Sequence, residues 1–212
     1  MKLIKRDFSK QYHENPLYRE AEHSQRNQCR LQALLEYKQG GKLLEIGCGM
    51  GGFLRLAESH FEVEGIDVSH YAVKAIHPHF GDRVSVYNVE QRPMPRSTYD
   101  VIVVFNILEH LRQPNKVIDK LSAALLPGGV MIGSVPNNQG VIGSLNTRLG
   151  NFFDRTHVST FRPDVWQRMF THAGFRSTDF FGEVTLGRNR CRYIRRPIWP
   201  HVSFNLMFVC QK

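Results

Sequence analysis

Two acids and a group of glycines are the residues of this chain with the clearest chemistry. An apolar run that begins at Leu43 carries Glu45 two residues before a glycine-rich turn at residues 47–52. Glycines in such a turn let backbone N–H groups approach a ligand closely. A second apolar run ends, about one strand-helix-strand step later, in Asp67, an acid placed to bind ribose hydroxyls. The pattern predicts a nucleoside-bearing cofactor held at one edge of a parallel sheet.

The glycine spacing alone leaves two cofactors open. Gly47, Gly49 and Gly52 also satisfy the nicotinamide fingerprint G-x-G-x-x-G, with Asp67 at the expected distance. However, Glu45 puts a carboxylate where a pyrophosphate needs a neutral or positive field. A cationic sulfonium ligand without phosphate has the opposite need. The acid therefore favours a sulfonium nucleoside, and a nicotinamide dehydrogenase is the weaker alternative.

Several segments, in order and at ordinary spacing, resemble motifs of class I S-adenosylmethionine-dependent methyltransferases. Residues 43–51 resemble that family's E-x-G-x-G-x-G turn, and residues 65–69 resemble its second motif. Residues 99–111 and 126–132 are similar to its fourth strand with the following helix and to the turn into its fifth strand. The Leu-Glu-His and Pro-Gly-Gly elements resemble the small-molecule branch that includes ubiquinone-type O-methyltransferases. The resemblance implies S-adenosylmethionine as the cofactor and favours oxygen as the methyl acceptor.

The resemblance also assigns the cofactor contacts. It implies that Glu45 supports the methionine end of the cofactor, and that Asp67 takes the ribose hydroxyls beside Val68 at the adenine. Asn88 stands where relatives place an acid for the adenine amine, and an Asn oxygen can still accept that hydrogen bond. The expected cofactor-binding residues are Glu45, Gly47, Cys48, Gly49, Gly51, Asp67, Val68, Asn88, Val89, Phe105, Asn106 and Ile107.

Two histidines are the candidate catalytic residues. His110 follows the fourth predicted strand, and His157 lies in a D-x-x-H stretch similar to one in the small-molecule branch. An imidazole titrates near neutrality and can serve as a general base. The alternatives are packing of His110 on the cofactor and a structural role for His157. Because Asn106 replaces a Glu found at this place in ubiquinone-type enzymes, we expect no metal site.

The acceptor is expected to contact a basic segment near the end of the chain. Five arginines fall within residues 188–196, and the net charge of the whole chain is +9. Arginines bind phosphate or carboxylate through a planar fork, so we expect an anionic or lipid-linked small molecule, with peripheral contact to a membrane. A solvated charged loop is the alternative for this segment. The expected acceptor-binding residues are Arg188, Arg192, Tyr193 and Arg195.

Two other function classes are weighed against a small-molecule methyltransferase. A nucleic-acid methyltransferase would suit the basic charge, but the N/D-P-P-Y motif of base-amine enzymes is missing after the fourth predicted strand. A non-catalytic cofactor-binding protein is the third class. An intact glycine turn followed by Asp67 argues against it.

The elements that position these residues alternate between strand and helix. Such alternation implies parallel crossovers, so we predict an α/β fold. This is a single doubly wound, mostly parallel seven-stranded sheet with helices on both faces and an antiparallel last strand. The expected strands are 42–47, 62–67, 83–87, 100–105, 129–135, 176–182 and 203–210, and the expected helices are 17–38, 51–59, 69–77, 114–125 and 163–173.

The chain is expected to form one domain with three appended features. Residues 1–41 are predicted to be an arm and helix over the cofactor site, followed by a methyltransferase domain at 42–212. Residues 137–160 are predicted to be a lid and residues 183–202 a basic loop. Four scattered cysteines and the lack of an apolar leader favour the reducing cytoplasm.

Overall fold

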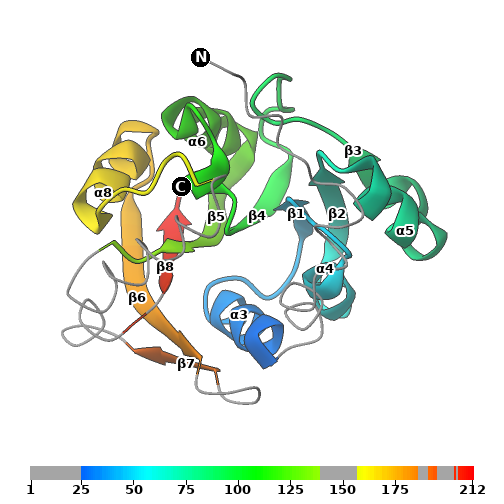
Figure 1. Cartoon of the computed structure of the whole chain (residues 1–212), viewed down its shortest axis with the longest axis horizontal. Helices are drawn as coiled ribbons and strands as arrows, with labels where there is room; N and C mark the ends of the chain where they lie inside the picture. Colours follow the sequence, from blue (N-terminus) through cyan, green and yellow to red (C-terminus); the bar gives the residue numbers. More distant parts are fainter. Residues whose placement is uncertain (1–24, 139–156, 186–190, 195–202, 204) are drawn as a thin grey trace.

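The computed structural model describes residues 25–138, 157–185, 191–194, 203 and 205–212. Helices and strands alternate through this part, and the strands join one sheet (Figure 1). The helices are α3 (Gln25–Leu35), α4 (Gly52–Ala57), α5 (His70–Phe80), α6 (Pro114–Ala124) and α8 (Pro163–His172), with single 3₁₀ turns η1 (Gly81–Arg83) and η2 (Leu108–His110). The strands are β1 (Lys42–Ile46), β2 (Glu62–Asp67), β3 (Val84–Val86), β4 (Tyr99–Phe105), β5 (Leu125–Pro136), β6 (Ser177–Thr185), β7 (Cys191–Ile194) and β8 (Asn205–Gln211).

The sheet has the doubly wound order that the sequence predicts. Its strands are arranged β3-β2-β1-β4-β5-β8-β6-β7, and the first five are parallel to their neighbours. The order of connection reverses between β1 and β4. In such sheets ligands bind in the crevice beyond the carboxyl ends of the strands at this reversal. The fold therefore places the turn after β1 and the residues after β4 at one common edge.

An eighth strand, β7, departs from the sequence prediction. Residues 183–202 were expected to be a loop, but β7 pairs antiparallel with β6, from Gly182 opposite Ile194 to Thr185 opposite Cys191. The prediction of a loop is therefore wrong for β7 and for the end of β6. Cys-Arg-Tyr-Ile ends in two β-favouring residues, Tyr193 and Ile194, a signal that the surrounding arginines obscured.

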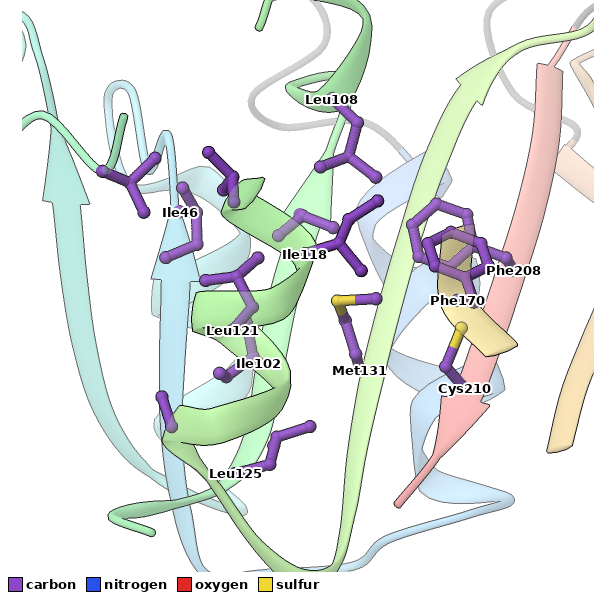
Figure 2. Packing of buried hydrophobic residues seen from close by; sticks show 14 of the residues in the cluster. Ile46, Ile102, Leu108, Ile118, Leu121, Leu125, Met131, Phe170, Phe208 and Cys210 are labelled. Carbon is purple, nitrogen blue, oxygen red and sulfur yellow. The ribbon is translucent and has the colours of Figure 1, made fainter. Parts of the chain in front are cut away.

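Two hydrophobic layers cover the two faces of the sheet. Helices α6 and α8 pack on one face, and α3, α4 and α5 pack on the other. Strand β4 contributes buried side chains to both layers, which explains its uninterrupted apolar sequence. Figure 2 shows Phe170 of α8 against Phe208 of β8. Their ring centroids are 4.7 Å apart.

Helix α5 runs farther than expected. The sequence suggested an end at residue 77, but the helix continues through Pro78 to Phe80. Ser69 caps the start of the helix, and its hydroxyl accepts from the backbone N–H of Ala72 at 3.2 Å. Among the described helices, none has the length and apolar character needed to cross a membrane.

The aromatic core under α8 gives a first prediction. Phe170 is fully buried and contacts the rings of Trp166, Phe175, Phe180 and Phe208. Replacing Phe170 with Ala leaves a large cavity, so we expect the free energy of unfolding in urea to fall by about 3–5 kcal/mol.

Arg168 on the same helix provides the control. Its side chain is 70% exposed, so Arg168→Ala should change the free energy of unfolding by less than about 0.5 kcal/mol. A loss below about 1 kcal/mol for Phe170→Ala would mean that α8 is not part of the core.

Candidate active site

The turn after β1 is shaped by close packing on one side and open space on the other. Gly47 (φ 73°) allows no side chain, because a Cβ there would lie 2.1 Å from the Cδ1 of Ile107. At Gly49 (φ 51°), none of the described residues lies within 4 Å of an added Cβ. Backbone N–H groups of Gly47 and Cys48 donate to the carbonyl of Ile66 at 2.7 and 3.1 Å. The turn is therefore tied to β2 and open at Gly49, as a bound ligand requires.

Glu45 is a buried carboxylate that lacks a partner on one oxygen. It lies on β1, and its Oε2 makes no hydrogen bond in the described part of the chain. Burial raises the pKa of Glu45 well above its ordinary value, the charge of Arg30 opposes the rise, and that of Asp67 adds to it. An enclosed acid of this kind is costly unless a cation or a donor reaches it. This observation fits the ammonium-bearing methionine end of S-adenosylmethionine.

Asp67 lies across the turn and is held by backbone N–H groups. Its two oxygens accept from the N–H groups of Gly49 at 2.9 Å and Ser69 at 2.8 Å. Each oxygen keeps a further lone pair, so the acid can still receive ribose hydroxyls. Val68, the next residue, is 43% exposed. An apolar side chain left open beside this acid fits an adenine ring.

Residues after β3 that were expected to contact the cofactor already contact other parts of the protein. The side-chain oxygen of Asn88 accepts from the N–H of Glu90 at 3.0 Å, so this oxygen already has one partner. Val89 is buried in the core layer under α6. Cys48, in the turn, is also buried, and burial raises the pKa of its thiol far above the ordinary value. A protonated thiol at this place fills space and does not act as a nucleophile.

The chain makes a sharp bend as β4 ends. Asn106 has a left-handed backbone (φ 54°), a conformation that Asn tolerates better than most residues. Its N–H donates to the carbonyl of Ser134 on β5 at 2.9 Å, and its Oδ1 accepts from the Ser134 hydroxyl at 3.0 Å. Phe105, just before it, packs edge-on against Phe53 with ring centroids 5.1 Å apart.

A buried ionic group joins α3 to this edge of the sheet. The guanidinium of Arg30 lies 4.2 Å from the ring centroid of Phe105, donates to the hydroxyl of Ser134 at 3.2 Å, and lies 3.5 Å from Glu183. Arg26, one helical turn earlier, also donates to Glu183. Although burial alone would raise the pKa of Glu183, the charges of Arg30 and Arg26 hold it below its ordinary value. Glu183 is therefore ionised, with its Oε2 3.5 Å from the Nε of Arg30.

The two predicted catalytic histidines meet in space. The rings of His110 on η2 and His157 lie 4.8 Å apart, centroid to centroid. Backbone N–H groups of Val158 and Ser159 donate to the carbonyl of Glu109, each at 2.9 Å, and so bring His157 back over η2. One ligand atom from each of Glu109, His110 and His157 lies within 4.8 Å of the others. Two imidazoles and a carboxylate can hold a divalent transition ion, so the expected absence of metal stays a prediction.

The predicted acceptor residues are placed only in part. Arg188 and Arg195 lie outside the described residues, as do residues 1–24 of the predicted arm and residues 139–156 of the predicted lid. Arg192 and Tyr193 belong to β7. Tyr193 packs against Phe181 with ring centroids 5.1 Å apart.

Three residues of the site were missed by sequence reasoning: Arg30, Ser134 and Glu183. Arg26 and Arg30 are spaced by one helical turn, and Glu183 is an acid at the end of the largely apolar run 180–184. Both are signals of a buried ion pair. However, the partners are more than 150 residues apart, and no local spacing links them.

Comparison with known proteins identifies the relatives of this fold. A protein family described as "Methyltransferase domain" matches residues 18–179. A probable S-adenosylmethionine-dependent methyltransferase of Mycolicibacterium smegmatis is 29% identical over 68% of this chain and 55% of its own length. A ubiquinone biosynthesis O-methyltransferase of Bordetella avium is 32% identical over 50% of this chain and 47% of its own. The chain thus spans about half the length of these curated relatives.

Solved structures agree on the fold. A methyltransferase of Thermotoga maritima, titled a possible histamine N-methyltransferase, superposes with a TM-score of 0.73 at 14% identity and covers 92% of both chains. An S-adenosylmethionine-dependent methyltransferase of Archaeoglobus fulgidus gives a TM-score of 0.69 at 17% identity, covering 92% of this chain and 98% of its own.

The burial of Glu45 predicts a pH-dependent effect on stability. Because the folded chain raises the pKa of this carboxyl, the ligand-free protein loses stability as pH rises above the unfolded value of about 4.3. Glu45→Gln removes that loss. We expect equal melting temperatures near pH 4, and a variant that melts about 3 °C or more above wild type near pH 8, as about 1 kcal/mol would give.

Glu62→Gln is the matched control, because Glu62 is an exposed acid on the neighbouring strand β2. Glu62→Gln should show the same change in melting temperature between pH 4 and pH 8 as wild type. A Glu45→Gln variant that melts lower than wild type near pH 8 would show that the carboxylate is already stabilised in the ligand-free protein.

Proposed function

The chain belongs to the class I S-adenosylmethionine-dependent methyltransferases, and we propose that it transfers a methyl group to a small molecule, with oxygen as the preferred acceptor atom. The observation that carries this proposal is the buried, partly unpaired carboxylate of Glu45 beside the open face of Gly49. A dinucleotide phosphate placed there would be repelled, whereas a cationic nucleoside would be attracted.

The residues of the turn and of β2 would hold the cofactor from two ends. When bound, S-adenosylmethionine supplies a methyl group on a positively charged sulfur that leaves readily. Glu45 balances positive charge at the methionine end, Asp67 receives the ribose hydroxyls, and Val68 covers the adenine. Helix α3 borders the site through Arg30, which contacts Phe105 and Ser134 at the end of β4. Exclusion of water and positioning supply much of the catalysis in such a displacement.

The histidine pair would remove the proton of the acceptor. His110 and His157 face each other beside the carboxyl end of β4. One imidazole takes the hydroxyl proton while the second, with Glu109 in the same cluster, stabilises the resulting imidazolium.

The acceptor we propose is an anionic or lipid-linked small molecule. Strand β6 is antiparallel to β8, which is antiparallel to β5, so β6 ends at the same edge as β4. The basic segment at residues 188–196 follows β6 directly. Several curated relatives are named ubiquinone biosynthesis O-methyltransferases, which supports a small acceptor and oxygen chemistry over a nucleic acid.

Ligand binding tests the choice of cofactor. We expect calorimetry to give a dissociation constant in the micromolar range for S-adenosylhomocysteine and no heat for NAD. Transfer from tritium-labelled S-adenosylmethionine to small-molecule extracts should exceed transfer to RNA. NAD binding, or transfer to RNA alone, would contradict the proposal.

Replacement of the histidines tests the role of the pair. We expect His110→Ala and His157→Ala each to lower kcat by about 10²-fold or more, while the affinity for S-adenosylhomocysteine stays within about threefold. The control is His172→Ala, an exposed histidine on α8, which should keep full activity.

Removal of metal ions by a chelator distinguishes a general-base role of the histidine pair from a metal-binding role. Because we assign the proton to an imidazole, dialysis against EDTA should leave kcat unchanged. A loss of activity that added Zn²⁺ restores would assign the cluster to a metal ion instead.

A further inference from the structure

Within the part of the chain that the structure describes, the side chain of Asn106 has a hydrogen-bond partner at one of its two polar ends. Its Oδ1 accepts from the hydroxyl of Ser134 at 3.0 Å. Its amide nitrogen makes no hydrogen bond to any residue that the structure describes. Ser134 is fully buried, whereas Asn106 is half-buried at the reversal point of the sheet. The free end of the amide is therefore the end that a ligand at this edge can meet.

The orientation of this amide follows from a residue that can only donate. The Nη2 of Arg30 donates to the hydroxyl oxygen of Ser134 at 3.2 Å. An arginine has no acceptor, so this bond uses a lone pair of Ser134 and leaves the hydroxyl hydrogen for another partner. That hydrogen goes to the Oδ1 of Asn106. The NH₂ group of Asn106 then points away from Ser134.

The hydrogen-bonded series that sets this orientation is held in place at Arg30. Glu183 holds Arg30 at 3.5 Å, and the ring of Phe105 lies 4.2 Å from the guanidinium carbon. Glu183 and Arg30 are both buried, and this ion pair holds the guanidinium in place with its Nη2 donating to Ser134. The bonds therefore run in one direction, from Arg30 through Ser134 to Asn106.

We propose that the NH₂ group of Asn106 is a specificity-determining donor that selects an oxygen acceptor over an amine. This inference rests on the proposed methyl transfer. An acceptor oxygen has one lone pair for the methyl carbon and another to receive the N–H of Asn106. A neutral amine has a single lone pair, which the reaction uses, so its N–H groups would face the N–H groups of Asn106. An unmade hydrogen bond at such a site discriminates strongly.

In the methyl transfer, each bond that forms is matched by a bond that breaks. The acceptor oxygen bonds to the methyl carbon as the sulfur–methyl bond breaks, and that electron pair stays on sulfur. The hydroxyl proton moves to the imidazole of His110 or His157. Asn106 keeps its hydrogen-bond-donating role throughout and exchanges no proton.

The orientation of the amide can be observed without any acceptor. In the complex with S-adenosylhomocysteine, the Asn106 amide protons are identified in the ¹⁵N spectrum as the pair lost in Asn106→Asp. We expect these protons to exchange rapidly with water and to show no Overhauser effect to the β-protons of Ser134. Protected amide protons that contact Ser134 would overturn the proposal, whether or not methyl transfer is detected.

Matched acceptors test the selection. The probes are catechol and ortho-phenylenediamine, with tritium-labelled S-adenosylmethionine. We expect wild type to prefer the hydroxyl compound by at least tenfold in kcat/KM. Asn106→Asp should lose about 100-fold in kcat/KM on the hydroxyl compound. Ser134→Ala frees the amide to rotate and should lower the hydroxyl-to-amine ratio, an effect that general structural damage would not produce.

Asn115→Asp is the control. It places the same charge change on an exposed residue of α6 and should leave the ratio unchanged. Equal rates on both probes, or an unaltered ratio in Ser134→Ala, would overturn the selection. Failure of wild type to bind S-adenosylhomocysteine would instead contradict the proposed function.

Discussion

The burial of the Glu45 carboxylate beside a glycine turn is the constraint around which this molecule is organised. The end of a parallel strand is a place where backbone donors and side chains from several elements converge. Here, one oxygen of Glu45 has no hydrogen-bond partner among the described residues, and burial raises the pKa of this carboxyl. A protein keeps such a group at a cost in stability. The cost is understandable if a cationic ligand completes the site, and it disfavours a phosphate-bearing one.

A second buried charge system connects the periphery of the fold to this edge. Arg30 joins α3 to Glu183 on β6 and, through Ser134, to the residue after β4. Segments distant in the sequence thereby share one network. The antiparallel strands β6, β7 and β8 consequently do more than extend the sheet, because β6 supplies the acid that orients the arginine. The same network fixes which end of the Asn106 amide faces Ser134.

The sequence predicted the fold well and the site in part. Strands such as β1, β2 and β4 are apolar runs bounded by turns, and their type follows from local pattern. The acids Glu45 and Asp67 follow from their spacing to the glycines. Strand β7 was missed because it stands among arginines in the sequence. Arg30, Ser134 and Glu183 were missed for a different reason: their importance comes from contacts between α3, β5 and β6, and contacts across such separations leave no local periodicity. The meeting of His110 with His157 was likewise invisible, although each histidine had been singled out.

Proton linkage to cofactor binding tests the central claim most directly. If the carboxylate of Glu45 ionises to balance the positive charge of the ligand, then binding of S-adenosylhomocysteine must release protons from a group whose pKa was raised. Calorimetry in buffers of different ionisation enthalpy measures that number. We predict a net release near neutral pH that shrinks markedly in Glu45→Gln. An identical proton count in wild type and variant would contradict the account.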